Sequence, residues 1–281
     1  MKIVRTISDL RKITNAWRQS GASFSLVPTM GGLHEGHLSL VRAAVSRADK
    51  VVVTIFVNPT QFAPNEDFAE YPRDEDADSN LLLGVGADLI FAPTVEEMYS
   101  EEQRTKVLVE GLGEILEGEF RPHFFCGVAT VVSKLLVQAM PDIAIFGEKD
   151  YQQLCVIRAM VRDLNFPTKI IAGETVREPD GLAMSSRNIL LNEVQRAIAP
   201  SLSLSLREIG EVARGCGDIA EACHKESKKL TLAGFSCIDY ITFRDAETLE
   251  PMKILDRPAR VLGAAWLEKV RLIDNIGLIP E

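Results

Sequence analysis

Two of the chain's four histidines, His34 and His37, stand three residues apart among the glycines of the stretch PTMGGLHEGH, residues 28–37. A short apolar run precedes them, so we expect a strand, a glycine turn and the first turn of a helix, with both imidazoles on one side. Backbone N–H groups at a helix start attract anions, and glycines let a phosphate approach the main chain closely. Two imidazoles there can donate hydrogen bonds to a phosphoryl group that gains charge in a transition state.

Two other interpretations of these histidines stay open. They can simply cap the helix or face solvent, or they can bind a metal ion. A helical zinc pair of the H-E-x-x-H kind needs spacing i, i+4, and only His123 and His224 remain as further imidazoles. We therefore favour phosphate contact over metal ligation.

A second polar stretch, IFVNPTQF, follows the apolar run VVVT and carries two amides, Asn58 and Gln61. Amides can donate to a carboxylate while they accept from hydroxyl groups, which suits a hydroxy acid as ligand. The alternative is a turn in which Asn58, directly before Pro59, bonds the local backbone.

The stretch FGEKDYQQL lies at the end of another predicted strand and the start of a helix. Lys149 supplies positive charge for phosphates, and Gly147 permits close approach of the backbone. Asp150 can accept from a ribose hydroxyl or cap the helix, and the two roles are compatible.

The stretch MSSRN follows a Pro-Asp-Gly turn at residues 179–181 that marks a plausible hinge. Ser185, Ser186 and Arg187 can hold phosphates, and a mobile loop would shield a reactive intermediate from water. Taken alone, such a triplet is more typical of a surface loop.

The acidic stretch YPRDEDAD, residues 71–78, is typical of a solvated helix start, with Asp74, Glu75 and Asp76 near the positive end of the helix dipole. Asp78 is a weaker candidate for recognising an ammonium group or Mg²⁺.

Apolar runs alternate with helical periodicity through the first part of the chain, which predicts a parallel sheet with ligands at the carboxyl ends of its strands. The predicted strands are 23–28, 50–58, 87–93, 142–147 and 168–173. Beyond residue 178 we expect a smaller α+β domain. It has helical regions at 192–214, interrupted near Pro200, and at 218–232, then strands at 236–244 and 259–267. Two domains, 1–177 and 178–281, follow from this change of pattern.

The composition disfavours some classes of protein. The 281 residues carry a net charge of −9, which disfavours nucleic-acid binding, and no segment approaches the roughly 20 apolar residues of a membrane span. The amino terminus lacks the apolar core of a secretory signal, so we expect a cytoplasmic protein. Five cysteines form no C-x-x-C pair, and reduced thiols are expected.

The strand, turn and H-x-G-H stretch resemble the nucleotidyltransferase superfamily, which binds ATP on a Rossmann-like sheet. IFVNPTQF, YPRDEDAD, FGEKDYQQL, DGLAMSSRN and AAWLEKVRLIDN, in this order, further resemble the pantothenate synthetases, also called pantoate–β-alanine ligases. The resemblance extends over nearly the whole chain.

This resemblance implies a reaction in two steps. Pantoate would attack the α-phosphate of ATP to give pantoyl adenylate and pyrophosphate, and β-alanine would then release pantothenate and AMP. It also implies a first domain that binds ATP and pantoate, a C-terminal lid domain, Mg²⁺ carried by the ATP phosphates, and a homodimer.

The same resemblance implies site residues. His37, His34 and Lys149 would be catalytic. Contacts to pantoate and β-alanine would come from Gln61, Gln153 and Asn58. The ATP-binding set would be Met30, Gly31, Gly32, Leu33, His34, Glu35, Gly36, His37, Gly147, Glu148, Lys149, Asp150, Val176, Met184, Ser185, Ser186 and Arg187.

One stretch departs from the family pattern R-P-G-H-F-x-G-V. The chain has RPHFFCGV, so His123 stands at the usual glycine position and Phe124 at the usual histidine position. We expect that this imidazole is shifted by one residue or that its role is absent, and we exclude His123 from the site.

Two further hypotheses stay open at this point. Another H-x-G-H adenylyltransferase would join AMP to a phosphate ester, but Asn58, Gln61 and Gln153 argue against an anionic acceptor of that kind, which calls for Arg or Lys. A non-catalytic nucleotide sensor on the same fold is the other.

Overall fold

The computed structural model describes residues 1–63, 68 and 71–280. It divides into two compact units. The first comprises Met1–Glu148 and Gln152–Glu174, and the second comprises Lys149–Tyr151 and Thr175–Glu281. The main division falls between Glu174 and Thr175, and the short segment Lys149–Tyr151 joins the second unit, which the sequence did not indicate.

The first unit is an α/β structure, as predicted. Two of its elements, η2 and α7, include residues of the segment Lys149–Tyr151 that belongs to the second unit. With η marking 3-10 turns, the elements are β1 Lys2–Val4, α1 Ile7–Gln19, β2 Phe24–Thr29, α2 Glu35–Val45, β3 Lys50–Ile55, η1 Pro59–Gln61, α3 Glu75–Gly84, β4 Leu89–Phe91, α4 Val95–Met98, α5 Glu117–Phe120, α6 Phe124–Ala139, β5 Ile143–Gly147, η2 Glu148–Asp150, α7 Tyr151–Asp163 and β6 Lys169–Gly173.

The six strands form one parallel sheet in the order β1-β4-β3-β2-β5-β6, which confirms the predicted parallel sheet. β3 is shorter than predicted because the chain leaves the sheet after Ile55 and enters the turn that Asn58 caps. The strand β1 was not predicted, since it has three residues and only Val4 is buried.

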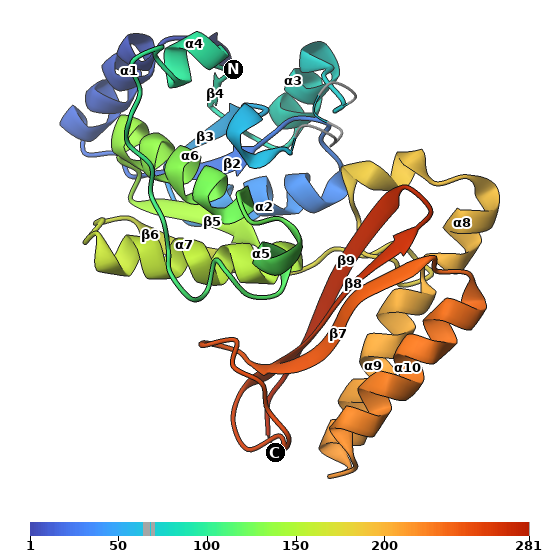
Figure 1. Cartoon of the computed structure of the whole chain (residues 1–281). Helices are drawn as coiled ribbons and strands as arrows, with labels where there is room; N and C mark the ends of the chain where they lie inside the picture. Colours follow the sequence, from blue (N-terminus) through green and yellow to red (C-terminus); the bar gives the residue numbers. More distant parts are fainter. Residues whose placement is uncertain (64–67, 69–70, 281) are drawn as a thin grey trace. The chain divides into compact units, whose positions relative to one another are not determined.

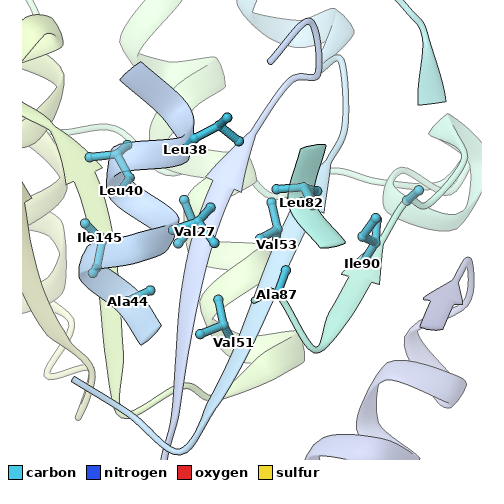
Figure 2. Close-up of a cluster of buried hydrophobic side chains, with 12 residues drawn as sticks. Val27, Leu38, Leu40, Ala44, Val51, Val53, Leu82, Ala87, Ile90 and Ile145 are labelled. Atoms are coloured by element: carbon cyan, nitrogen blue, oxygen red, sulfur yellow. The ribbon is translucent and has the colours of Figure 1, made fainter. Parts of the chain in front are cut away.

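Helices pack on both faces of the central strand β2, whose side chains alternate between them. Phe24 meets the ring of Trp17 from α1 edge-on, with 5.8 Å between the ring centroids. Val27 points the other way, into a cluster with Val51 of β3 and Leu38 of α2 (Figure 2). Leu38, Val41 and Ala44 are buried and form the face of α2 that packs on the sheet.

The order of winding reverses between β2 and β5. From β2 the chain builds outward through β3 and β4, and it then returns to place β5 on the other side of β2 (Figure 1). At such a switch point the loops after the two strands separate and leave room for a ligand. The loop after β2 is the one that contains His34 and His37.

The second unit is the predicted α+β structure. Its further elements are η3 Ser186–Leu190, α8 Glu193–Ile198, α9 Ser201–Arg214, α10 Ile219–Ala233, β7 Cys237–Asp245, β8 Ala259–Leu267 and β9 Val270–Leu278. Three antiparallel strands pair in the order β7-β8-β9, and α9 and α10 pack together against them (Figure 1). The helical region breaks at Pro200, as expected.

The third strand of this sheet, β9, was missing from the prediction. Its inward positions, Val270, Leu272, Ile276 and Leu278, alternate correctly, but Asp274 interrupts the apolar pattern. That carboxylate is buried and ion-paired with Arg177, so the strand carries a charge where the pattern calls for an apolar residue.

No helix in the described ranges is both long enough and apolar enough to cross a membrane. All five cysteines hold free thiols, in agreement with the prediction.

Candidate active site

The loop after β2 reaches α2 through two glycines in the left-handed region. Gly31 has φ 87° and Gly32 has φ 62°, a conformation that side chains with a Cβ rarely adopt. The loop then places His34 at the N-cap of α2 and His37 in its first turn. The predicted strand, glycine turn and helix are all present.

The two imidazoles form a capping box at the start of α2. His34 Nδ1 accepts a hydrogen bond from the Gly36 N–H at 3.1 Å, and His37 Nδ1 accepts one from the His34 N–H at 3.4 Å. The ring centroids are 4.1 Å apart. The capping interpretation is therefore confirmed, and it does not compete with phosphate contact: a neutral imidazole that accepts at Nδ1 carries its proton on Nε2 and is a donor there.

Asp78, on the first turn of α3, supports this loop. Its Oδ2 accepts from the Gly32 N–H at 3.0 Å and its Oδ1 from the Leu33 N–H at 2.8 Å. Burial raises the pKa of the Asp78 carboxyl, although the two N–H groups oppose that shift. The predicted helix start is present, and Asp74 caps α3 by accepting from the Ala77 N–H at 2.9 Å.

The role of Asp78 as an anchor of the loop was not predicted. One signal was available in the sequence: Asp78 and Leu82 are four residues apart, and both lie on the buried face of α3. A carboxylate on the apolar face of a helix needs a partner, and this partner lies about 45 residues away in the chain.

The amide turn after β3 is built around Asn58, which is 1% exposed. Its Oδ1 accepts from the Tyr99 hydroxyl at 2.7 Å, and its Nδ2 donates to Gln61 Oε1 at 3.0 Å. Gln61 Nε2 in turn donates to Met30 Sδ at 3.1 Å, which joins the amide turn to the histidine loop. The structure thus gives Asn58 the contacts of a turn-forming residue that holds Gln61; a substrate contact by Asn58 stays a prediction.

The stretch that departs from the family pattern lies beside Gln61. Arg121 Nη2 donates to the Gln61 carbonyl oxygen at 3.1 Å, and Arg121 Nη1 pairs with Glu117 at 3.2 Å. The guanidinium lies 3.9 Å from the centre of the Phe124 ring. His123 is exposed at the N-cap of α6 and makes no side-chain capping bond, so Phe124, not a shifted imidazole, packs on Arg121.

On α7 the two neighbouring glutamines differ. Gln152 is buried and bonds the backbone of residues 112–117: its Oε1 accepts from the Glu117 N–H at 3.0 Å, and its Nε2 donates to the Leu112 and Ile115 carbonyls. Gln153 is half-buried, and its predicted contact with pantoate stays a prediction.

In the second unit, residues 176–184 form a short hairpin that carries the MSSRN loop. The Met184 N–H donates to the Val176 carbonyl at 3.0 Å, and Arg177 and Ala183 pair as an isolated bridge. Ser185 then caps η3, its Oγ accepting from the Arg187 N–H at 3.3 Å. The hairpin thus brings Val176, a predicted ATP contact, next to the predicted phosphate loop.

Lys149 and Asp150 lie in the short segment of the second unit, within η2. Their charged groups are 4.0 Å apart, and the Lys149 side chain is 20% exposed. Gly147 ends β5 and Glu148 begins η2. The stretch therefore follows the carboxyl end of a parallel strand, where ligands are expected.

Comparisons with known proteins identify the family of the chain. The family model described as pantoate-beta-alanine ligase matches residues 2–277. The pantothenate synthetase of Paramagnetospirillum magneticum is 54% identical over 99% of this chain and 98% of that protein. The pantothenate synthetase of Rhodospirillum rubrum is 49% identical, over 99% of each chain.

Solved structures show the same fold. Pantothenate synthetase from Thermus thermophilus superposes with a TM-score of 0.94 at 45% identity, over 100% of both chains. Pantoate-beta-alanine ligase from Francisella tularensis, complexed with beta-gamma ATP and beta-alanine, superposes with a TM-score of 0.84 at 35% identity, over 98% of this chain and 97% of that one. The chain belongs to the pantoate-beta-alanine ligase family of enzymes.

Proposed function

We propose that this chain condenses pantoate with β-alanine at the expense of ATP, through a pantoyl adenylate. The observation that carries the proposal is the pair of histidines whose Nδ1 atoms are both engaged as acceptors at the helix start, which fixes both Nε2 atoms as donors. The Francisella tularensis relative, crystallised with beta-gamma ATP and beta-alanine, supports nucleotide and amine as substrates.

In the first step, a carboxylate oxygen of pantoate attacks the α-phosphorus of ATP. The bond from that phosphorus to the oxygen bridging the β-phosphate breaks, and pyrophosphate leaves. Negative charge shifts onto the leaving group and the non-bridging oxygens. We assign His37 and His34 to donate from Nε2 to these oxygens, because donors fixed in advance need no rearrangement as charge develops.

In the second step, the neutral amine of β-alanine attacks the acyl carbon of the adenylate. The bond from that carbon to the phosphate oxygen breaks, AMP leaves, and the amine nitrogen loses a proton. The product amide is pantothenate. We expect a closed site during this step, since water competes with the amine for the mixed anhydride.

ATP contacts divide between several segments. The N–H groups of Gly32 and Leu33 donate to Asp78, and those of His34 and Gly36 donate to the imidazoles. We therefore assign phosphate contact in this loop to the imidazole Nε2 atoms and to the remaining backbone groups of residues 30–37. Lys149 would neutralise phosphate charge. Ser185, Ser186 and Arg187 would hold the β- and γ-phosphates.

For the acid and amine, Gln61 is the proposed contact. Its side chain is oriented from both sides, by Asn58 through Oε1 and by Met30 through Nε2. Gln153 remains the proposed second contact to pantoate, and residues 1–177 the proposed ATP- and pantoate-binding domain, with 178–281 as lid.

We further propose that Mg²⁺ enters with ATP, held by phosphate oxygens and water, and supplies neutralising charge. We do not assign Asp78 as its ligand, because the carboxylate is buried and already holds the loop through two backbone N–H groups. A homodimer, which the family resemblance implies, completes the proposal, together with the cytoplasmic location expected from the sequence.

The test is release of AMP by the purified chain. We expect release only when pantoate and β-alanine are both present, with pantothenate formed in equal amount by mass spectrometry. Release that is indifferent to the acid or the amine would refute the proposed reaction.

A further inference from the structure

Two buried polar residues stand next to each other on β9 and have no part in the chemistry above. Asp274 is 5% exposed and Asn275 is 3% exposed. They belong to the stretch AAWLEKVRLIDN, which the family resemblance singled out without a role. Successive residues of a strand point to opposite faces of the sheet, so the two side chains reach different parts of the second unit.

Asn275 holds the backbone of Lys149. Its Nδ2 donates to the Lys149 carbonyl oxygen at 3.0 Å, and its Oδ1 accepts from Arg260 Nη1 at 2.8 Å. The Arg260 guanidinium also lies 3.9 Å from the centre of the Tyr151 ring. The Tyr151 hydroxyl donates to the Ala246 carbonyl at 2.7 Å. The segment Lys149–Tyr151 is therefore fastened to the C-terminal sheet at both ends.

A glycine gives the Arg260 guanidinium room in this arrangement. Gly277 pairs with Arg260 across β8 and β9, and a Cβ at Gly277 would meet the Arg260 guanidinium carbon at 3.2 Å. Because Gly277 has no Cβ, the Arg260 guanidinium lies close against β9, where it contacts both Asn275 and the Tyr151 ring.

Asp274 holds the base of the hairpin that carries the MSSRN loop. Its two oxygens accept from Arg177 Nη1 and Nη2 at 2.7 and 2.9 Å, a bidentate ion pair. Arg177 also donates to the Gly181 carbonyl at 3.0 Å and to Ser203 Oγ at 3.1 Å. Arg177 is one side of the bridge that leads into Met184 and Ser185.

We infer that Asp274 and Asn275 are positioning residues for the triphosphate of ATP. They fix the Lys149 backbone and the base of the 184–187 loop to one strand. The cation and the loop that we propose to hold the phosphates are therefore set in place before the nucleotide arrives. This inference rests on the proposed function, since it takes from there the role of Lys149 and of the loop.

The test compares Asn275→Ala with Asn275→Asp. Asn275→Ala removes the donor to Lys149, and Asn275→Asp keeps the volume and the acceptor for Arg260 but has no donor for the Lys149 carbonyl. Loss of this buried hydrogen bond should weaken binding of a non-hydrolysable ATP analogue with Mg²⁺, measured by calorimetry, about tenfold in both variants. The KM for pantoate should stay within twofold.

Asp239→Asn is the matched control. Asp239 lies on β7 of the same sheet, and its side chain is 6% exposed. It accepts from Trp266 Nε1 at 3.0 Å and Arg271 Nε at 2.7 Å, and it has no contact with Lys149 among those the structure gives. This variant should lower the melting temperature but leave analogue binding within twofold of the wild type.

Three outcomes would overturn the inference: unchanged analogue binding in a folded Asn275→Ala variant, weakening in Asn275→Asp alone, which would indicate a charge effect, or equal weakening in Asp239→Asn. The binding measurement needs no turnover. A wild-type chain that binds the analogue but makes no pantothenate would therefore refute the proposed reaction, while the variants would still decide the positioning. A wild-type chain that does not bind the analogue would overturn both.

Discussion

The Asp78 carboxylate accepts a hydrogen bond from the Gly32 N–H at 3.0 Å, which ties the first turn of α3 to the loop between β2 and α2. Gly32 has a positive φ angle, and a glycine adopts positive and negative φ angles about equally, so its own conformation does not fix the loop. A buried carboxylate with two backbone partners supplies the missing constraint. The position of both imidazoles therefore depends on a side chain more than 40 residues away in the chain.

Replacing Asp78 with asparagine should impair catalysis. The amide can accept from only one of the two N–H groups and turns an N–H donor toward the other. Hydrogen bonds to a charged group are worth about 1.5–3 kcal/mol each, so we expect kcat/KM to fall by about 10- to 100-fold. Steady-state AMP release measures this.

The control for Asp78 is Asp76→Asn, because Asp76 is exposed on the same turn of α3. It should change kcat/KM less than twofold. Equal effects of the two substitutions, or an active Asp78→Asn variant, would show that the loop does not need its buried anchor.

Replacing His37 with asparagine separates its two roles. An asparagine oxygen can take the place of Nδ1 and accept from the His34 N–H, but it leaves no donor at the position of Nε2. We expect kcat to fall by at least about 100-fold while binding of an ATP analogue changes less than fivefold. His224→Asn, at an exposed position of α10, should leave both quantities unchanged. Retained turnover in His37→Asn would limit His37 to capping.

Phe124 offers a test of the altered family stretch. Its ring packs on Arg121, which holds the Gln61 carbonyl. A cation–π contact of this kind is worth about 1–2 kcal/mol, so Phe124→Ala should raise the KM for pantoate about five- to thirtyfold and leave the KM for ATP unchanged. Phe124→His should restore most of the loss, because a flat ring returns, and His123→Ala should have no effect. A rise in the KM for ATP instead would place Phe124 elsewhere in the mechanism.

Asp245 predicts a pH dependence of stability. Burial pushes its pKa up, but hydrogen bonds from the Thr248 and Glu247 N–H groups and from Arg257 outweigh it and lower the pKa to about 2. A carboxyl whose pKa is lower in the folded state stabilises the fold above its ordinary pKa, and this contribution is lost as the pH falls toward 2.

The expected contribution of Asp245 is about 2 kcal/mol at neutral pH. Urea unfolding followed by Trp266 fluorescence, in a Trp17→Phe background, should show a constant deficit in the free energy of unfolding for Asp245→Asn above about pH 5. That deficit should shrink between pH 4 and pH 2. A deficit that does not vary with pH would mean that ionisation of Asp245 contributes nothing.

Much of the fold could be predicted because its strands are long apolar runs separated by periodic helices. β8 was predicted at its observed bounds, 259–267, and the break at Pro200 follows from the missing N–H of proline. β9 was missed because an ion pair at Asp274 replaces an apolar residue. The segment Lys149–Tyr151 belongs to the second unit, where Arg260 contacts Tyr151 and Asn275 contacts Lys149. These contacts could not be predicted because the partners lie more than 100 residues apart in the chain.

The candidate site also has residues that could be predicted from the sequence and residues that could not. The two histidines could be found because their chemistry and their glycine neighbours are adjacent in the chain. The partners of Asp78 and Arg121 could not be assigned, since Leu33 and Gln61 lie 45 and 60 residues away. The spacing of Asp78 and Leu82 indicates a buried carboxylate but not the group that it contacts. Local spacing identifies the residues that can do chemistry, while tertiary contacts decide which residues hold them.

Exchange of labelled pyrophosphate into ATP tests the adenylate step most directly. The account predicts exchange that requires pantoate, proceeds without β-alanine and is lost in His37→Asn, because formation of the adenylate is reversible and precedes attack by the amine. Exchange that requires β-alanine, or no exchange by an enzyme that makes pantothenate, would contradict the pantoyl adenylate.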